Sequence, residues 1–332
     1  WPLDLVLCKN CSLLQLKETT PAKELYTERY GYKSGINQTM RDELGGVVEA
    51  SMSRVALNPG DAVVDIGAND GTLIGNYPAD YYRVAFEPIE KFAHDCRPKA
   101  DLVFNTFFSK EQFDKFCPGI KAKIITAISM FYDLDDPNQF VADMAGILDK
   151  DGLIVIQQNY VGGMLQNVAF DNVVHEHLEY YSLTSLEHLL NRHGLEVIEV
   201  ELRELNGGSF RTYIKHMSTL KRMRYYERRQ RLDTEWPYTL FGMRVKSVGQ
   251  KILKFVRDEV AKGKTIYLYG ASTRVGTILQ YCGLDNKLIK AAVERNPEKW
   301  GKKLMSMDIP IISEEQARKD KPDIFFVGPW FF

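Results

Sequence analysis

The sequence predicts an α/β protein with two domains of alternating strands and helices. Short β-branched runs alternate with amphipathic stretches between residue 46 and about residue 216, a pattern typical of repeated strand–helix units. A second series of the same kind begins at Lys264. The length of 332 residues also indicates about two domains, at roughly 150 residues each.

The composition excludes several classes of protein. The 43 lysines and arginines balance 44 acidic residues, so the net charge is -1 and the basic surface of a general nucleic-acid binder is not expected. No apolar stretch approaches the roughly 20 residues that span a bilayer, so no membrane partner is expected. Five scattered cysteines do not form a disulfide scaffold, and we therefore expect a cytoplasmic protein.

The first series contains four predicted strands and a hairpin. The four strands are short apolar runs that span Ala62–Ile66, Tyr82–Phe86, Ile124–Ile128 and Leu153–Gln157. The hairpin is predicted from two runs that flank a Gly207-Gly208 turn, namely Leu195–Leu202 and Ser209–Lys215.

Residues 217–262 are predicted to be helical and largely polar. The basic run from Lys221 to Arg231 could touch phosphates, but charge runs more often belong to a solvated helix, so a connecting helix is favoured. Thr265–Tyr269 is predicted to be the first strand of the second series.

A glycine turn follows the first predicted strand. Gly67 and Gly71 let the backbone approach a ligand closely, and the predicted helix after them would offer free N–H groups. Glu87 follows the next strand, where an acidic side chain can accept hydrogen bonds from ribose hydroxyls. The spacing is not that of a dinucleotide fingerprint, and Asp65 and Asp70 suit a ligand with an ammonium group and no phosphate. S-adenosylmethionine (SAM) fits both requirements; the alternative is a tight turn without a ligand.

Further residues of the same loops are candidate cofactor contacts. They follow the ends of the predicted strands, the edge at which such sheets bind ligands, and they are Asn69, Pro88, Asn105, Phe107 and Met130. Phe107 and Met130 could equally be core residues.

The segment from His175 to Tyr181 is the densest group of titratable side chains. Histidine accepts protons near neutral pH, and an extended H-x-H backbone places His175 and His177 on one face with Glu176 on the other. A zincin site requires H-E-x-x-H, which is absent, and a metal site built on the two histidines has no obvious third ligand. A polar surface turn remains an alternative, but a catalytic base is favoured.

Cys8 and Cys11 have the spacing of a zinc knuckle. A structural zinc takes four ligands, and the other three cysteines are single and distant. Either the pair is an orphan or, as we favour, its partners lie upstream of Trp1.

With these residues identified, the sequence resembles the sugar C-methyltransferases, which use SAM to methylate nucleotide-linked 4-keto-deoxysugars. The resemblance covers essentially the whole chain. The motifs that carry it are the glycine turn together with Pro2–Cys11, Tyr30–Ser34, His175–Leu183, Asn206–Arg211 and Tyr269–Arg274.

The resemblance implies a class I methyltransferase Rossmann-like domain with a partial zinc module before it and a second Rossmann-like domain after it. The corresponding boundaries are 1–45 for the zinc module, 46–216 for the SAM-binding domain, 217–262 for a helical connector and 263–332 for the C-terminal domain. It also implies a structural zinc at two cysteine pairs, of which Cys8 and Cys11 form the second. The oligomeric state is left open.

The resemblance also implies the roles of the site residues. His177 matches the proposed base of the family, with Glu176 beside it. Some members carry a tyrosine where Val174 stands, so Tyr30, Tyr32 or a water held by His175 would have to polarise the keto oxygen. The sugar nucleotide is expected to contact Tyr180, Tyr181, Asn206, Ser209 and Arg211. The planar guanidinium of Arg211 suits the diphosphate, because it can donate two hydrogen bonds at once, and a surface salt bridge is the alternative. The alternatives are an O- or N-methyltransferase and a non-catalytic protein that binds SAM or a sugar nucleotide.

Overall fold

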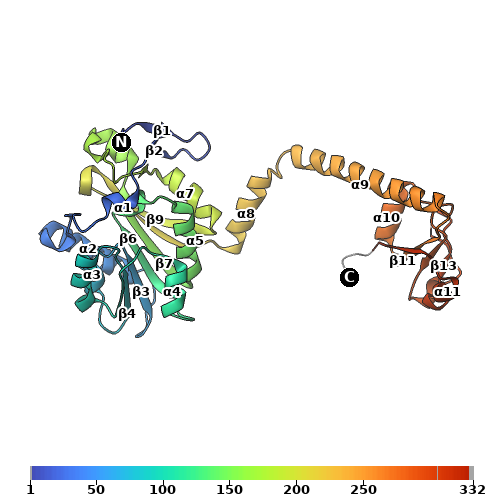
Figure 1. Ribbon diagram of the computed structural model, residues 1–332, viewed down its shortest axis with the longest axis horizontal. Helices are drawn as coiled ribbons and strands as arrows, with labels where there is room; N and C mark the ends of the chain where they lie inside the picture. The colour runs from blue at the N-terminus through green and yellow to red at the C-terminus, as the bar shows by residue number, and fades with distance from the viewer. Residues whose placement is uncertain (1, 305, 329–332) are drawn as a thin grey trace. The chain divides into compact units, whose positions relative to one another are not determined.

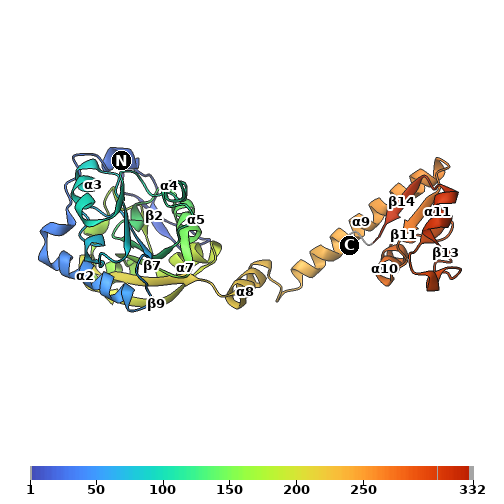
Figure 2. The ribbon, with the colours of Figure 1, turned by 90° about the horizontal axis from the view of Figure 1, so that it is seen from below.

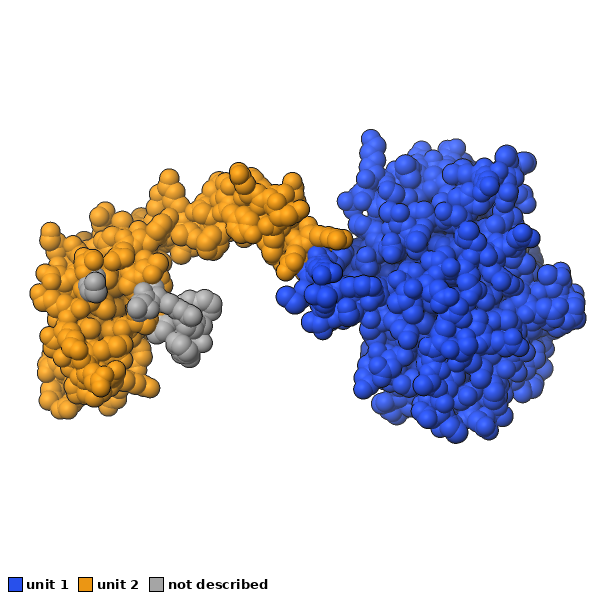
Figure 3. Space-filling model, turned by 180° about the vertical axis from the view of Figure 1, so that it is seen from behind, with its two compact units in different colours: residues 1–225 blue, residues 226–332 orange. Residues whose placement is uncertain are grey.

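The computed structural model describes residues 2–304 and 306–328, without the side chains of Asn206, Thr273 and Arg274. The chain forms two compact units that meet in the sequence between Tyr225 and Tyr226 (Figure 3). The N-terminal segment and the first strand–helix series belong to the same unit.

The first unit is built on a seven-stranded sheet with the order β5-β4-β3-β6-β7-β10-β9. The first five strands in this order are parallel to one another, and β10 runs antiparallel to both β7 and β9. The strands are β3 (Ala62–Ile66), β4 (Tyr82–Phe86), β5 (Leu102–Phe104), β6 (Ala122–Ile128), β7 (Leu148–Asn159), β9 (Leu195–Arg203) and β10 (Ser209–His216). The predicted strands and the predicted hairpin are confirmed, whereas the three-residue edge strand β5 is too short to show a periodicity.

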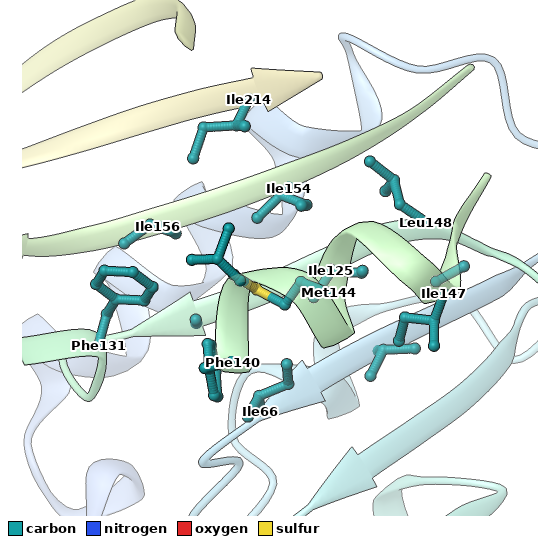
Figure 4. Packing of buried hydrophobic residues seen from close by; sticks show 14 of the residues in the cluster. Ile66, Ile125, Phe131, Phe140, Met144, Ile147, Leu148, Ile154, Ile156 and Ile214 are labelled. Atoms are coloured by element: carbon teal, nitrogen blue, oxygen red, sulfur yellow. The ribbon is translucent and has the colours of Figure 1, made fainter. Parts of the chain in front are cut away.

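Helices cover both faces of this sheet (Figure 1). Successive strand residues point to opposite faces, so Val64 packs in one core and its neighbour Val63 in the other. Figure 4 shows the larger core, where Phe140, Met144 and Ile147 of α5 lie against the sheet. The helices of the unit are α1 (Ala22–Leu25), α2 (Gln38–Met52), α3 (Glu90–Cys96), α4 (Lys110–Phe116), α5 (Pro137–Ile147), α6 (Val161–Asn167) and α7 (Leu183–Arg192).

A second, three-stranded sheet ties the N-terminus to the middle of the chain. Strands β1 (Leu5–Leu7) and β2 (Leu14–Leu16) form a hairpin. Strand β2 also pairs with β8 (Glu179–Tyr180), so that Leu14 lies opposite Tyr180. The hairpin that carries Cys8 and Cys11 is therefore hydrogen-bonded to the strand directly after the His-Glu-His segment.

The prediction of a helix after the glycine turn is wrong. The chain forms only a 3₁₀ turn there, η2 (Ile74–Asn76). Pro78 has no N–H and forces the preceding Tyr77 into an extended conformation, with ψ of 136°, which ends the helical turn. The cofactor can therefore not be held at this turn by the N–H groups of an α-helix N-terminus.

Gly71 is required by packing as well as by its backbone. Its φ is +73°, and a Cβ at this position would lie 2.8 Å from Cys96 Sγ and 3.0 Å from Cys96 Cα. The turn can therefore lie against the end of α3 only because residue 71 has no side chain.

We expect Gly71→Ala to lower the free energy of unfolding of the first unit by more than its backbone conformation alone explains. Gly119 is a matched control, because its φ is +76° and a Cβ at that position would meet nothing within 4 Å. Gly119→Ala should cost about 1 kcal/mol through backbone strain, and Gly71→Ala a further 1–3 kcal/mol, roughly, from overpacking. Urea denaturation of both variants measures the difference, and equal costs would contradict the packing argument.

The second unit contains a four-stranded parallel sheet with the order β13-β12-β11-β14. Figure 2 shows this sheet with helices α10 and α11 beside it. Its strands are β11 (Ile266–Tyr269), β12 (Ala291–Val293), β13 (Ile311–Ile312) and β14 (Ile324–Val327), and its helices α10 (Thr273–Cys282) and α11 (Glu314–Asp320). The sheet has the Rossmann-like character that the sequence predicts.

Two helices occupy the range predicted to connect the domains, α8 (Thr219–Gln230) and α9 (Trp236–Ala261). Val256 of α9 is buried in the core of the second unit. In residues 2–304 and 306–328, no helix combines the length and the apolar character that crossing a bilayer requires.

Candidate functional site

The first unit contains a cavity of about 310 Å³ at the carboxyl ends of its parallel strands. Loops after β3, β4, β5 and β6 form most of its wall, and the N-terminal segment closes it. This is the edge at which open α/β sheets bind ligands. The lining residues are Ala22, Tyr26, Tyr30, Tyr32, Ser34, Met40, Leu44, Ile66, Gly67, Asn69, Phe86, Glu87, Pro88, Ile89, Thr106, Phe107, Phe108, Ile128, Ser129, Met130, Asp133, Leu134, Asp135 and Phe140.

Glu87 presents its carboxylate to this cavity in a fixed orientation. Its two oxygens accept backbone hydrogen bonds from Asn69 N and Ile89 N, both at 2.8 Å. Each oxygen keeps a second lone pair, so the carboxylate can also accept hydrogen bonds from a ribose. Burial raises the pKa of Glu87, and the two backbone N–H groups oppose that rise.

The residues of the cavity meet the requirements of SAM. Gly67 lines it with a φ of +71°, and a Cβ there would lie 3.0 Å from Met130 Cγ, so a side chain would fill the cradle. Glu87 would supply an acceptor for a bound ribose, and Pro88 and Phe107 would supply apolar surface for an adenine ring.

Six of the predicted cofactor residues thus line the cavity: Gly67, Asn69, Glu87, Pro88, Phe107 and Met130. Asn105 is exposed and is not among the lining residues; its amide donates to the backbone oxygens of Glu87 at 3.1 Å and Pro88 at 3.0 Å. It positions the loop that carries Glu87 and does not itself face the ligand space.

Three further predicted cofactor contacts have structural roles instead. Asp65 is 3% exposed and accepts a 2.7 Å hydrogen bond from Thr126 Oγ1, and burial raises its pKa to about 7. Asp70 accepts hydrogen bonds from Gly35 N and Thr72 Oγ1. Gly71 packs against Cys96.

The glycine turn binds the chain's own N-terminal segment. Asn69 Oδ1 accepts a hydrogen bond from Ser34 N at 2.9 Å, and Asn69 Nδ2 donates to Tyr32 O at 3.0 Å. Gly35 N donates to Asp70 Oδ2 at 3.2 Å. These bonds hold Tyr30 and Tyr32, the two predicted catalytic tyrosines, in the cavity wall.

His177 is held beside the cavity in a defined tautomer, although it is not part of the lining. Its Nδ1 lies 2.8 Å from the carbonyl oxygen of Asn172, which can only accept, so Nδ1 carries the hydrogen and Nε2 has the free lone pair. Burial lowers the pKa of His177, so that the ring is neutral at pH 7. Its ring contacts that of Tyr132 edge-on, with 4.4 Å between centroids.

The two neighbours of His177 differ in what they face. The charge of Glu176 bears on Tyr30 and Asp133, both of which line the cavity. His175 is partly buried in the same loop. The segment therefore borders the wall that contains Tyr30 and Asp133.

The predicted substrate residues lie mostly in the interior. Tyr181 is 1% exposed and donates a 2.7 Å hydrogen bond to Glu179, so it is a core residue rather than a substrate contact. Tyr180 is buried in β8, and Ser209 is buried with its hydroxyl on Leu205 O. The predicted contact of the Asn206 side chain lies outside the described residues.

Arg211 is the centre of a buried network, which corrects its predicted role as a diphosphate ligand. Its guanidinium donates to Gln157 Oε1 at 2.7 Å and forms ion pairs with Glu43 at 2.8 Å and Glu201 at 3.4 Å. With 2% of the residue exposed and these three partners, it has no accessible face for a phosphate.

We expect Arg211→Met to destabilise the first unit by about 1–3 kcal/mol, because the buried Gln157 would lose its hydrogen-bond donor and Glu43 would keep only Arg203 as an ion-pair partner. Lys215→Met on the same strand, where the side chain is partly exposed, should cost less than about 1 kcal/mol. Urea denaturation tests both. If Arg211→Met folds with wild-type stability and only substrate binding suffers, the diphosphate role is reinstated.

Cys8 and Cys11 form a turn suited to a metal thiolate. Backbone amides of Cys11 and Asn10 point at the Cys8 sulfur and lower the pKa of that thiol, whereas burial raises the pKa of Cys11. Within the part of the chain that the structure describes, no group of three or more His, Cys, Asp or Glu side chains could hold a metal ion. The zinc site therefore stays a prediction, with these two cysteines as its only identified ligands.

Among the titratable residues that line the cavity, three were not predicted from the sequence, namely Tyr26, Asp133 and Asp135. Asp133 lies in the loop after β6, a position that could have marked it, since another lining carboxylate, Glu87, lies in the loop after β4. No local sequence pattern marked Tyr26 as a residue of the site.

The strand order, the glycine turn and the acidic residue after β4 define a class I SAM-dependent methyltransferase. A family model described as "Methyltransferase domain" matches residues 40–200, and one described as "C-methyltransferase C-terminal domain" matches residues 204–332. C-methyltransferase NovU of Streptomyces niveus is 28% identical over 340 residues, which cover 99% of this chain and 80% of that protein. The chain is a SAM-dependent C-methyltransferase, as its motifs predict.

Solved structures of more distant methyltransferases also resemble the chain. Magnesium protoporphyrin IX methyltransferase (ChlM) from Synechocystis PCC 6803, with bound SAH, is 13% identical with a TM-score of 0.43, and the match covers 57% of this chain and 91% of that one. N-methyltransferase NodS from Bradyrhizobium japonicum WM9 is 12% identical with a TM-score of 0.41, over 55% and 99%. At such scores neither likeness adds to what the strand order defines.

We expect Glu87→Gln to weaken the binding of S-adenosylhomocysteine about 10- to 100-fold, because a hydrogen bond to a charged group contributes roughly 1.5–3 kcal/mol. Glu90→Gln is the control, since Glu90 is exposed on α3 and forms an ion pair with Arg97. Isothermal titration calorimetry measures both affinities. Equal affinities for the two variants would place the ribose elsewhere.

Proposed function

We propose that the protein methylates a carbon next to the ketone of a nucleotide-linked 4-keto-deoxysugar. The observation that carries the proposal is His177, a neutral imidazole whose Nδ1 is committed to Asn172 O and whose Nε2 is left as a base. A C-methyltransferase needs such a base, since an unactivated carbon is not a nucleophile, whereas removal of a proton next to a ketone produces an enolate. The motifs shared with the sugar C-methyltransferases support the choice of substrate class.

The roles of the chain's own residues follow from this assignment. His177 takes the proton from the carbon, and its contact with Tyr132 keeps the ring beside the cavity wall. Tyr30 and Tyr32 lie in that wall, where their hydroxyls can orient the sugar. Gly67 and Glu87 hold SAM, which when bound supplies an electrophilic methyl group. Much of the rate is then expected from positioning.

The burial of Arg211 removes the contact first expected for the diphosphate. The hydroxyl of Ser209 likewise donates its hydrogen to Leu205 O within the protein. The nucleotide end of the substrate therefore depends on groups outside the strand β10, and the sugar end depends on the tyrosines of the N-terminal segment.

We expect His177→Ala to slow both methyl transfer and exchange of the substrate C–H with solvent by at least about 10²-fold, the contribution typical of a general base. The assay incubates a thymidine-diphosphate-linked 4-keto-6-deoxyhexose in deuterated water with S-adenosylhomocysteine and follows deuterium uptake by mass spectrometry. The affinity for S-adenosylhomocysteine should not change.

His94→Ala is the control, because that histidine is exposed on α3, with 75% of its side chain accessible. It should exchange and methylate at the wild-type rate. If His177→Ala exchanges as fast as the wild type, the base is another residue. If methylation proceeds on oxygen or nitrogen without any exchange, the carbon-acid chemistry is wrong.

A further inference from the structure

Asp133 is a cavity residue that the proposed reaction does not yet use. It ends the 3₁₀ turn η4 (Phe131–Asp133) in the loop after β6, and it lines the same cavity as Gly67 and Glu87. Its Oδ2 accepts a 2.7 Å hydrogen bond from the hydroxyl of Tyr26. Its Oδ1 is buried and has no hydrogen-bond partner among the residues that the structure describes.

The surroundings of Asp133 favour a neutral carboxylic acid. A buried carboxylate oxygen without a donor is costly, whereas a protonated Oδ1 carries its own hydrogen and needs only an acceptor. Burial raises the pKa of Asp133 well above its ordinary value, and the carboxylates of Glu176 and Glu179 raise it further; only the hydrogen bond from Tyr26 opposes them.

The other titratable groups that bear on Asp133 are phenols. They come from every element packed around it: Tyr26 after α1, Tyr30 in the N-terminal segment, Tyr132 in η4 and Tyr180 in β8. Among the groups that the described residues bring to bear on this carboxyl, none is a cation that would stabilise its ionised form.

Asp133 also lies on the wall that borders the base. The preceding residue, Tyr132, contacts the ring of His177, and Glu176 bears on both Asp133 and Tyr30. Val174 offers no hydroxyl on this side. A substrate ketone in the cavity would thus have a base near its α-carbon and a carboxyl group near its oxygen.

We propose that Asp133, as the neutral acid, donates a hydrogen bond from Oδ1 to the keto oxygen of the substrate and stabilises the enolate. The proposal rests on the proposed function. In the enolisation step the C–H electron pair becomes the new C=C bond, the C=O π pair moves onto oxygen, and the proton passes to Nε2 of His177. The proton of Asp133 stays on its Oδ1, and its Oδ2 continues to accept the hydrogen bond from the Tyr26 hydroxyl. A carboxylic acid in an apolar site is an effective oxyanion donor of this kind.

Two substitutions separate hydrogen-bond donation from charge. In Asp133→Asn, the Tyr26 hydroxyl selects the amide oxygen as its acceptor, which places the NH₂ donor where Oδ1 was. Asp133→Leu keeps the approximate size and removes every donor. In the deuterium exchange assay, Asp133→Leu should be about 10²- to 10³-fold slower than the wild type, and Asp133→Asn should stay within about tenfold of it. Both should bind S-adenosylhomocysteine like the wild type, which also reports that they fold.

The pH dependence supplies a signature that a merely structural residue would not give. Ionisation of Asp133 removes the donor, so the exchange rate of the wild type should fall at alkaline pH, and Asp133→Asn should lack this decline. The Tyr26 hydrogen bond stabilises the carboxylate, so its loss in Tyr26→Phe raises the pKa of Asp133 further and moves the decline to higher pH. Asp151→Asn, an exposed site on β7, is the control and should behave as the wild type.

The outcomes distinguish this inference from the proposed function. If the wild type exchanges but Asp133→Asn is as slow as Asp133→Leu, or keeps the alkaline decline, the role of Asp133 as a donor is overturned. If both variants bind S-adenosylhomocysteine more than about tenfold more weakly, Asp133 acts on the cofactor instead. A wild type that transfers methyl groups without exchange overturns the proposed carbon-acid chemistry itself.

Discussion

The hydrogen bonds between the glycine turn and the N-terminal segment are the constraint on which the site depends. Asn69 and Asp70 bind the backbone of residues Tyr32 to Gly35, and this contact places two tyrosines against the cavity. Asn69 in turn donates its backbone N–H to Glu87. One turn therefore orients the acidic residue expected to hold the cofactor and the segment that closes the cavity over it.

Three buried carboxyl groups of the first unit have raised pKa values, and one of them, Asp133, lines the cavity. Burial raises the pKa of Asp65 to about 7 and that of Glu179 to about 8, and it raises the pKa of Asp133 as well. Each of these carboxyls is held by a hydroxyl, from Thr126, Tyr181 and Tyr26 respectively. A hydroxyl group can bond to either protonation state of a carboxyl, whereas an arginine or lysine would enforce ionisation, so these three groups can be protonated.

Much of the fold and half of the site could be predicted from local patterns. Strands such as Ala62–Ile66 are apolar runs that need no knowledge of the rest of the chain, and Gly67 and Glu87 follow from their places at strand ends. The helix predicted after the glycine turn does not form, because Pro78 ends the helical turn and the prediction rested only on residues up to Thr72. Asp133 and Tyr26 were missed because their significance lies in a bond between residues 107 positions apart. Arg211 was misjudged because a motif does not show that Glu43, far away in the sequence, already occupies its guanidinium.

The pairing of β2 with β8 also has a consequence for the order of folding. Leu14 must find Tyr180 before the strand that follows the His-Glu-His segment is fixed, and contacts so distant in sequence form slowly because a long loop must close. During synthesis the hairpin leaves the ribosome long before its partner strand exists. We therefore expect the segment that contains the proposed base to be completed late in folding, once the N-terminal hairpin has paired with β8.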